Sequence, residues 1–243
     1  MKTQNLLMTF ISLFILGSGA LAQPFEMAYH GTYGPGPWYP LYATDFQHYS
    51  IEATNGGEYV LAGTILNSTA GHTDIHILKI DNVGNVLWDN HIDYVGQDDA
   101  ALDVMVDPND DIIITGYVNN GGNYPEMYVA KFDPSGGMIA DQIVQGFPTA
   151  ASAGTNIIFS QTTGNYIVGG FHNDPPISYP IIDGEAVMVE LDFGSLTPMA
   201  YCNLSTTGGP EDHTSVNDIV ELPGVGYFAI GTTQSSSGNG GVL

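Results

Sequence analysis

Aromatic and acidic side chains gather in the long segments between the predicted strands, and these residues could bind a ligand. Flat rings offer contact area at a low cost in conformational entropy, and carboxylates accept hydrogen bonds. Sugars and cationic peptides would suit such a surface. The residues predicted to bind a ligand are Trp38, Tyr39, Tyr124, His172, Asp174, Tyr179, Glu211 and Asp212. The alternative for Trp38 is that it only packs a proline-rich loop against the fold.

The sequence holds no recognisable catalytic motif and predicts no cofactor. Its seven histidines lack the H-x-x-x-H spacing that places two metal ligands on one helix face, and we interpret His76 and His91 as ordinary strand residues. Calcium binding is an open alternative, because paired carboxylates could supply several of the oxygen ligands that Ca²⁺ needs. The candidate pairs are Asp98 with Asp99 and Glu211 with Asp212.

A repeated strand that ends in glycine indicates which elements must position these residues. The strand occurs four times and ends at Gly63, Gly116, Gly170 and Gly231, so the repeat is about 53 residues long in the first copies. Each of the first three copies contains four short strands rich in β-branched and aromatic residues, with Gly, Asn and Asp in the hairpin turns. The fourth copy contains the first two of these strands. Four antiparallel strands with short hairpins at this period are typical of a β-propeller blade. We therefore predict an all-β fold.

We expect the chain to hold about three and a half blades of four-stranded antiparallel sheet. The predicted boundaries are 46–93, 98–145 and 151–204 for the complete blades and 213–243 for an incomplete one. Residues 24–31 are predicted to form a strand that closes the ring. We expect this chain to be a fragment of a larger ring, because a terminal strand of about four residues is a weak clasp for a closed sheet. A closed four-bladed propeller is the alternative.

The second repeat resembles a known family. The segments ALDVMVDPNDDIIITG at 101–116 and MYVAKFDPSG at 127–136 are similar to the bacterial β-propeller repeats often called SBBP. Later repeats depart from the pattern, since Glu190 replaces the lysine of the third strand and residues 176–185 form an insertion. The resemblance implies a propeller within an exported or surface protein. It implies no shared active site.

The first 22 residues predict a secretory signal peptide. Lys2 precedes an apolar run from Leu6 to Leu16 that is too short to span a bilayer, and small residues lead to the expected cleavage site before Gln23. We therefore expect a protein that is secreted or held at the cell surface, with no membrane span. Cys202 is the single cysteine, so packing must hold the exported fold together without an internal disulfide.

The composition is strongly acidic. The chain has 26 Asp and Glu residues against 3 Lys and Arg residues, which gives a formal net charge of −23. A field of this sign repels nucleic acid and attracts cations and cationic partners. Solubility in a salty extracellular medium is the simpler explanation of the charge. In either case we expect no nucleic-acid partner.

The predicted strand order puts all the long connections at one end of the blades, where we expect a ligand to bind. The connections between first and second strands and between third and fourth strands are tight turns, whereas the other connections are long and irregular. Binding residues usually lie in long loops on a rigid scaffold. We therefore predict a non-enzymatic binding or display module for a glycan, a peptide or a protein. The alternatives are a structural spacer and a polysaccharide hydrolase or lyase with carboxylates in the propeller channel.

Overall fold

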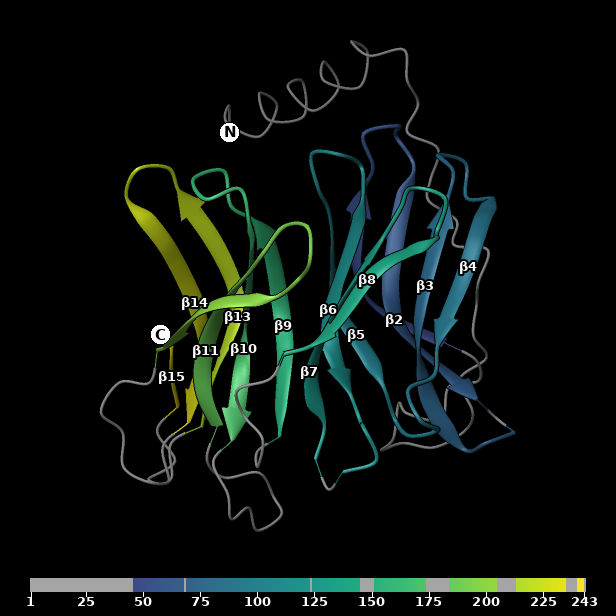
Figure 1. Cartoon of the computed structure of the whole chain (residues 1–243). Helices are drawn as coiled ribbons and strands as arrows, with labels where there is room; N and C mark the ends of the chain where they lie inside the picture. Colours follow the sequence, from purple (N-terminus) through teal and green to yellow (C-terminus); the bar gives the residue numbers. More distant parts are fainter. Residues whose placement is uncertain are drawn as a thin grey trace, which may run out of the picture. The chain divides into compact units, whose positions relative to one another are not determined.

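The first three repeats each fold into a four-stranded antiparallel sheet, and the fourth forms a three-stranded sheet (Figure 1). In every sheet the order of the strands is their order in the chain. The computed structural model describes residues 46–67, 69–122, 124–144, 151–173, 184–204, 213–234 and 240–242. The predicted ring-closing strand at 24–31 lies outside these ranges.

Fifteen strands make up the four sheets within the described residues. The first sheet contains β1 (Phe46–Ala53), β2 (Tyr59–Asn67), β3 (His72–Ile80) and β4 (Val86–Ile92). The second contains β5 (Ala100–Val106), β6 (Ile112–Val118), β7 (Glu126–Phe132) and β8 (Met138–Ile143). The third contains β9 (Ser152–Phe159), β10 (Tyr166–Asn173), β11 (Gly184–Leu191) and β12 (Pro198–Asn203). The fourth contains β13 (His213–Leu222), β14 (Gly226–Gln234) and β15 (Gly240–Val242).

The sheets are arranged as the blades of a β-propeller. The first strands of successive sheets contact one another, β1 with β5, β5 with β9 and β9 with β13, so they form the inner edge. No comparable contact joins β13 to β1 among the described strands. The predicted fold class, an all-β propeller of four-stranded antiparallel blades, is confirmed. Within the described ranges there is no helix long and apolar enough to cross a membrane.

A β-bulge in the first strand of every sheet explains the glycine that marks the repeat. The pairing register shifts by one residue beside Gly63, Gly116, Gly170 and Gly231. At Gly116 an added Cβ atom would lie 2.0 Å from the carbonyl oxygen of Ala100, a backbone atom of the paired strand. A side chain at this position would therefore force the two strands apart, and glycine is required.

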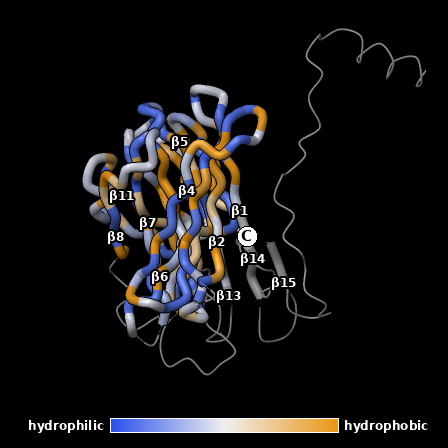
Figure 2. The backbone as a smooth tube through the Cα atoms, turned by 90° about the vertical axis from the view of Figure 1, so that its right-hand side faces the viewer, coloured by the Kyte–Doolittle hydropathy of each residue, from blue (hydrophilic) through white to orange (hydrophobic). Residues whose placement is uncertain are grey.

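Apolar side chains on both faces of the second and third strands form the core between neighbouring sheets. The strands in Figure 2 carry hydrophobic stretches (orange) interspersed with hydrophilic ones (blue). The cluster between the first and second sheets includes Val60, Ile75, Ile77, Ile112, Ile114 and Phe132. Corresponding clusters join the second sheet to the third and the third to the fourth. Packing thus holds the blades together, and Cys202 is free and exposed.

The face of the fourth sheet that points away from the third is apolar and exposed. Val220 and Phe228 pair across this sheet and are 56% and 55% exposed. Their equivalents in the second sheet, Met105 and Ile113, pair in the same way but are buried against the third sheet. The fourth sheet therefore lacks the cover that a following blade gives to the second. That the intact ring holds further blades stays a prediction.

The second strand of every sheet continues past the glycine at which the sequence analysis ends it, which corrects that prediction. β2 continues to Asn67, β6 to Val118, β10 to Asn173 and β14 to Gln234. The connection between β2 and β3 is therefore only four residues, 68–71, and not a long loop. Pairing continues past the bulge because Gly154 and Gly170 lie opposite each other, where the strands approach closely. His172, predicted to lie in a loop, therefore lies on a strand.

Candidate functional site

The chain reverses direction at both ends of each sheet, and the connections at the two ends differ in length. At the first, termed the turn end, short hairpins join β1 to β2, β3 to β4 and the corresponding strands of the other sheets. At the other, termed the loop end, the connections include the long segments between β10 and β11 and between β12 and β13. The sequence analysis predicts that the ligand-binding residues lie at the loop end.

Three carboxylates at the turn end are bonded within their own turns. Asp81, Asp133 and Asp192 each follow the third strand of a sheet, and each accepts hydrogen bonds from N–H groups two to four residues later. For Asp133 the donors are Ser135 N at 2.8 Å and Gly137 N at 3.0 Å. A side-chain hydrogen bond, helped by the backbone bonds, lowers the pKa of each of the three carboxyl groups. Their acceptor capacity is thus largely used by the turns.

A buried ion cluster at the turn end joins the second and third sheets. Lys131 Nζ lies 3.2 Å from Asp107 Oδ2 and 3.1 Å from Asp111 Oδ2. It also donates to the Tyr166 hydroxyl at 2.9 Å, and Tyr166 donates to Asp107 Oδ2 at 2.7 Å. The ammonium group lies 4.0 Å from the centroid of the Phe193 ring. Lys131 and Asp107 thus bind Tyr166 across the interface between the two sheets.

Lys79 holds the equivalent position in the first sheet and is also buried. Its Nζ lies 2.6 Å from Glu58 Oε2 and donates to the carbonyl oxygen of Pro134, in the next sheet, at 3.0 Å. Lys79 and Lys131 are the only Lys or Arg residues after Lys2. The described surface therefore carries no exposed Lys or Arg side chain to offset its acidic groups.

A carboxylate at the inner edge links three sheets. Asp103 on β5 accepts hydrogen bonds from Ser50 Oγ at 2.6 Å, from Asn156 Nδ2 at 3.1 Å and from Ile157 N at 2.8 Å. Burial raises the pKa of Asp103, and it also raises the pKa of Glu52 on the neighbouring inner strand. Because three donors from neighbouring sheets occupy Asp103, this carboxylate ties the blades together.

Two of the predicted ligand-binding residues lie in the described part of the chain. Tyr124 is half-buried just before β7. His172 is buried on β10 opposite Glu185 of β11, and its Nε2 lies 3.3 Å from Glu185 Oε2. The structure corrects its predicted loop position to a strand end, and its part in ligand binding stays a prediction. The predicted residues outside the described ranges are Trp38, Tyr39, Asp174, Tyr179, Glu211 and Asp212.

The two carboxylates of one candidate calcium pair bond to different parts of the backbone. Asp98 Oδ1 accepts a hydrogen bond from Thr73 N at 2.8 Å. Asp99 is buried and accepts hydrogen bonds from Tyr94 N at 2.6 Å and from Asn119 N at 2.9 Å. Burial raises the pKa of Asp99 to about 6 despite these two bonds. The pair therefore braces the connection between β4 and β5. The other candidate pair, Glu211 with Asp212, lies outside the described residues.

Six ionisable side chains share one face of the first sheet. We term this group the histidine face, and its members are His72, Asp74, His76, Asp89, His91 and Asp93. Alternate residues of a strand point to the same side, and His76 pairs with His91 across β3 and β4, so both rows point the same way. Ile75 and Ile77 point to the other side and pack against the second sheet.

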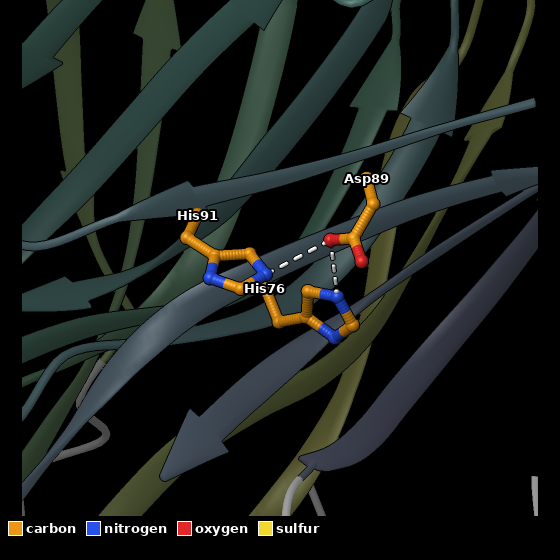
Figure 3. A group of neighbouring side chains, drawn as sticks. All are labelled: His76, Asp89 and His91. Atoms are coloured by element: carbon orange, nitrogen blue, oxygen red, sulfur yellow. Dashed lines mark hydrogen bonds and ion pairs between the residues drawn. The ribbon is translucent and has the colours of Figure 1, made fainter. Parts of the chain in front are cut away.

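At the centre of the histidine face, one carboxylate oxygen accepts hydrogen bonds from two imidazoles. His76 Nε2 donates to Asp89 Oδ1 at 2.8 Å, and His91 Nε2 donates to the same oxygen at 2.9 Å (Figure 3). The two rings meet edge to face with their centroids 5.0 Å apart. His76 is 2% exposed, and burial lowers its pKa, which favours the neutral imidazole. The three residues thus offer two nitrogens and one oxygen within 4.8 Å of one another.

A second trio of the histidine face lies nearer the loop end. His72 Nε2 lies 3.0 Å from Asp74 Oδ1 and 3.6 Å from Asp93 Oδ1. Asp74 is buried, while Asp93 is exposed. This trio offers one nitrogen and two oxygens, again within 4.8 Å of one another.

The sequence analysis identified neither trio. It interpreted His76 and His91 as ordinary strand residues, and a second β-bulge is the reason that their trio was missed. The register between β3 and β4 shifts by one residue just before their turn. Without that shift, His76 would pair with Asn90, and His91 would point to the opposite face. The same shift occurs in the second and third sheets. The shift is therefore a shared feature of the repeat, but strand alternation in the sequence does not reveal it.

Comparison with known proteins finds similarity among solved structures alone. No family model matches the chain, and no curated protein matches it. Among solved structures, the chain is similar to an endo-arabinase from Bacteroides thetaiotaomicron VPI-5482, with 13% sequence identity and a TM-score of 0.48. The likeness covers 76% of this chain and 69% of that chain. The propeller assignment rests on the strand pairing and sheet contacts above, and the resemblance to SBBP repeats stays a prediction.

Proposed function

We propose that this chain is a non-enzymatic binding or display module of a secreted or surface β-propeller, and that it engages a glycan, a peptide or a protein at its loop end. The contrast between the two ends carries the proposal. Carboxylates described at the turn end are bonded within their turns, to a buried lysine or to the turn of a neighbouring sheet. At the loop end the connections are longest, and they hold the predicted aromatic and acidic residues. Long loops on a rigid scaffold are where ligands usually bind.

The charge distribution favours ligands that bring hydrogen-bond donors or positive charge. The formal net charge is −23, and both described lysines are buried in ion pairs. Sugar hydroxyls and the ammonium groups of basic peptides donate to carboxylates. Nucleic acid carries the wrong charge for this surface. A neutral glycan or a cationic peptide or protein is therefore the expected class of ligand.

A polysaccharide hydrolase is the second candidate, and one observation favours it. Glu52 and Asp103 lie on neighbouring inner strands, and burial raises the pKa of both, as a general acid requires. However, Asp103 already accepts hydrogen bonds from Ser50, Asn156 and Ile157. The carboxylate is therefore held in a structural role, and binding without catalysis stays the first proposal.

A glycan array and a polysaccharide panel together distinguish the candidates. The purified exported protein is applied to the array, and the panel is assayed for released reducing ends. A binding module gives reproducible array signals and releases no product. Product release that disappears in Glu52→Gln would replace the proposal with a hydrolase. Neither binding nor release, together with no captured peptide or protein, would favour a spacer.

Export is part of the proposal and has its own test. We expect cleavage between Ala22 and Gln23, because small residues precede this bond and the apolar run is short. N-terminal sequencing or mass spectrometry of the exported protein should place its first residue at Gln23, including the cyclised pyroglutamate form. Recovery of residues 1–22 still attached in a membrane fraction would contradict this expectation.

A further inference from the structure

We propose that His76, Asp89 and His91 form a binding site for a first-row divalent transition metal ion, with Zn²⁺ as its best probe. The site is separate from the loop surface proposed above for the ligand. It lies within the β3 and β4 hairpin, where the side chains of one sheet face supply all three ligand atoms.

The three ligand atoms are already almost in place. Both histidine Nε2 atoms lie within 2.9 Å of Asp89 Oδ1. In a tetrahedral zinc site with bonds of about 2.0 to 2.1 Å, neighbouring ligand atoms are about 3.3 Å apart. An ion therefore fits if each separation between Nε2 and Asp89 Oδ1 widens by about half an ångström, which is well within ordinary side-chain adjustment. With the ion bound, each Nε2 presents its lone pair, and the ring proton resides on Nδ1.

Exposure leaves the site open on one side. His76 is buried and fixed, whereas the side chains of Asp89 and His91 are 48% and 45% exposed. The two exposed ligands can adjust to an ion that enters from solvent, and a water molecule can take the fourth position. Asp141, the equivalent of Asp89 in the second sheet, is also exposed although that sheet is packed against the first. Cover from another blade would therefore not close the site.

The donor set selects the class of metal. Two imidazole nitrogens and one carboxylate oxygen suit Zn²⁺, Cu²⁺ and Ni²⁺, whereas Ca²⁺ takes six to eight oxygen ligands. The acidic surface raises the local concentration of any divalent cation, because both described lysines are buried in ion pairs. The negative charge thus attracts all divalent ions, and the imidazole ligands favour transition metal ions over Ca²⁺.

The second sheet shows that the fold does not require these histidines. At the position of His76 it has Tyr128, which donates to Asp141 Oδ2 at 3.1 Å. At the position of His91 it has Ile143, which has no ligand atom. One phenol hydroxyl is therefore enough to satisfy the carboxylate in this architecture. In the first sheet two imidazoles instead point at one oxygen. This arrangement is suited to binding a metal ion, and packing does not require it.

The test is a calorimetric titration of the untagged exported protein with Zn²⁺ in metal-free buffer at pH 7.5. We expect one tightly bound Zn²⁺ that excess Ca²⁺ does not displace. His91→Ala and Asp89→Asn should each weaken Zn²⁺ binding at least about 100-fold. Removing a residue that only hydrogen-bonds to a metal ligand has a smaller effect, about 10- to 100-fold. Both changes are at half-exposed positions, so the metal-free variants should melt near the wild-type temperature. Co²⁺ in place of Zn²⁺ should give visible d–d absorption that His91→Ala abolishes.

Two variants serve as matched controls. Asp141→Asn changes the equivalent carboxylate of the second sheet and should leave Zn²⁺ affinity unchanged. His72→Ala disrupts the neighbouring trio and should also leave the tight site intact. Wild-type affinity in both His91→Ala and Asp89→Asn would overturn the proposal, as would loss of binding in His72→Ala alone. These readouts do not depend on any glycan or protein ligand, so they stand or fall separately from the proposed function.

Discussion

The turn end and the loop end of the sheets use the same residue types for different purposes. At the turn end, Asp81, Asp133 and Asp192 repeat the same role in three sheets, each holding its own turn. Away from these turns, equivalent positions in the strands differ between sheets, with His76 in the first sheet where the second has Tyr128. Contacts that recur from sheet to sheet therefore indicate a structural role. Positions at which the sheets differ indicate residues that can bind a ligand or a metal ion.

Among changes at the turn end, Lys131→Met should reduce the free energy of unfolding most, because it removes a buried ammonium group. Removing it leaves Asp107 and Asp111 without their cation, and breaking a buried ion pair costs about 3 to 5 kcal/mol. Urea unfolding should show this loss at an unchanged m-value. Lys79→Met is the matched control, and its effect should be smaller because its partner Glu58 is partly exposed. An equal or larger loss in Lys79→Met would contradict the account.

A smaller loss of stability is expected when a turn carboxylate is removed. Asp133→Ala deletes the acceptor of two backbone N–H groups and of the Ser135 hydroxyl. The free energy of unfolding should fall by less than in Lys131→Met, while Zn²⁺ binding and ligand binding stay at the wild-type level. A loss of ligand binding without a loss of stability would show that the turn end is itself functional.

The two ends should also respond to pH in opposite senses. The folded pKa of Asp99 is raised from 3.8 to about 6, so the folded state binds a proton more readily than the unfolded state in this interval. The contribution of Asp99 to stability should therefore rise as the pH falls from 7 to 4. The turn carboxylates have lowered pKa values, so their contribution is lost only as the pH falls below about 4.

Urea unfolding of the wild type and of Asp99→Asn at several pH values measures the contribution of Asp99. The stability of the wild type relative to the variant should increase between pH 7 and pH 4, because only the wild type can take up the proton. A difference that is independent of pH over this interval would show that Asp99 does not titrate there.

The propeller could be predicted from the sequence because its determinants are local. Strand alternation and turn residues fix each hairpin, and the glycine at the bulge recurs at Gly63, Gly116, Gly170 and Gly231. The inner-edge bonds of Asp103 were missed because they join residues that are 53 apart on different sheets. That separation equals the repeat, so aligning the repeats would have brought Ser50, Asp103 and Asn156 to one position.

The histidine face could not be predicted from strand alternation alone. Whether His76 and His91 share a face depends on a one-residue bulge, and a slip of one residue reverses the orientation of a strand. His172 was placed in a loop because the sequence gives no sign that pairing continues beyond Gly170. In both cases the deciding interaction is the register between strands, which residue type does not determine.

The central claim, that ligand binds at the loop end, is tested most directly by measuring the affinity of paired variants for the strongest ligand found on the glycan array or by capture. Trp38→Ala changes a residue that is predicted to lie at the loop end, and His172→Ala changes a strand end there. Asn82→Ala and Ser135→Ala change exposed positions at the turn end. The account predicts at least a tenfold loss of affinity in the first pair and wild-type affinity in the second. Loss of binding in Asn82→Ala or Ser135→Ala, with Trp38→Ala and His172→Ala unaffected, would contradict it.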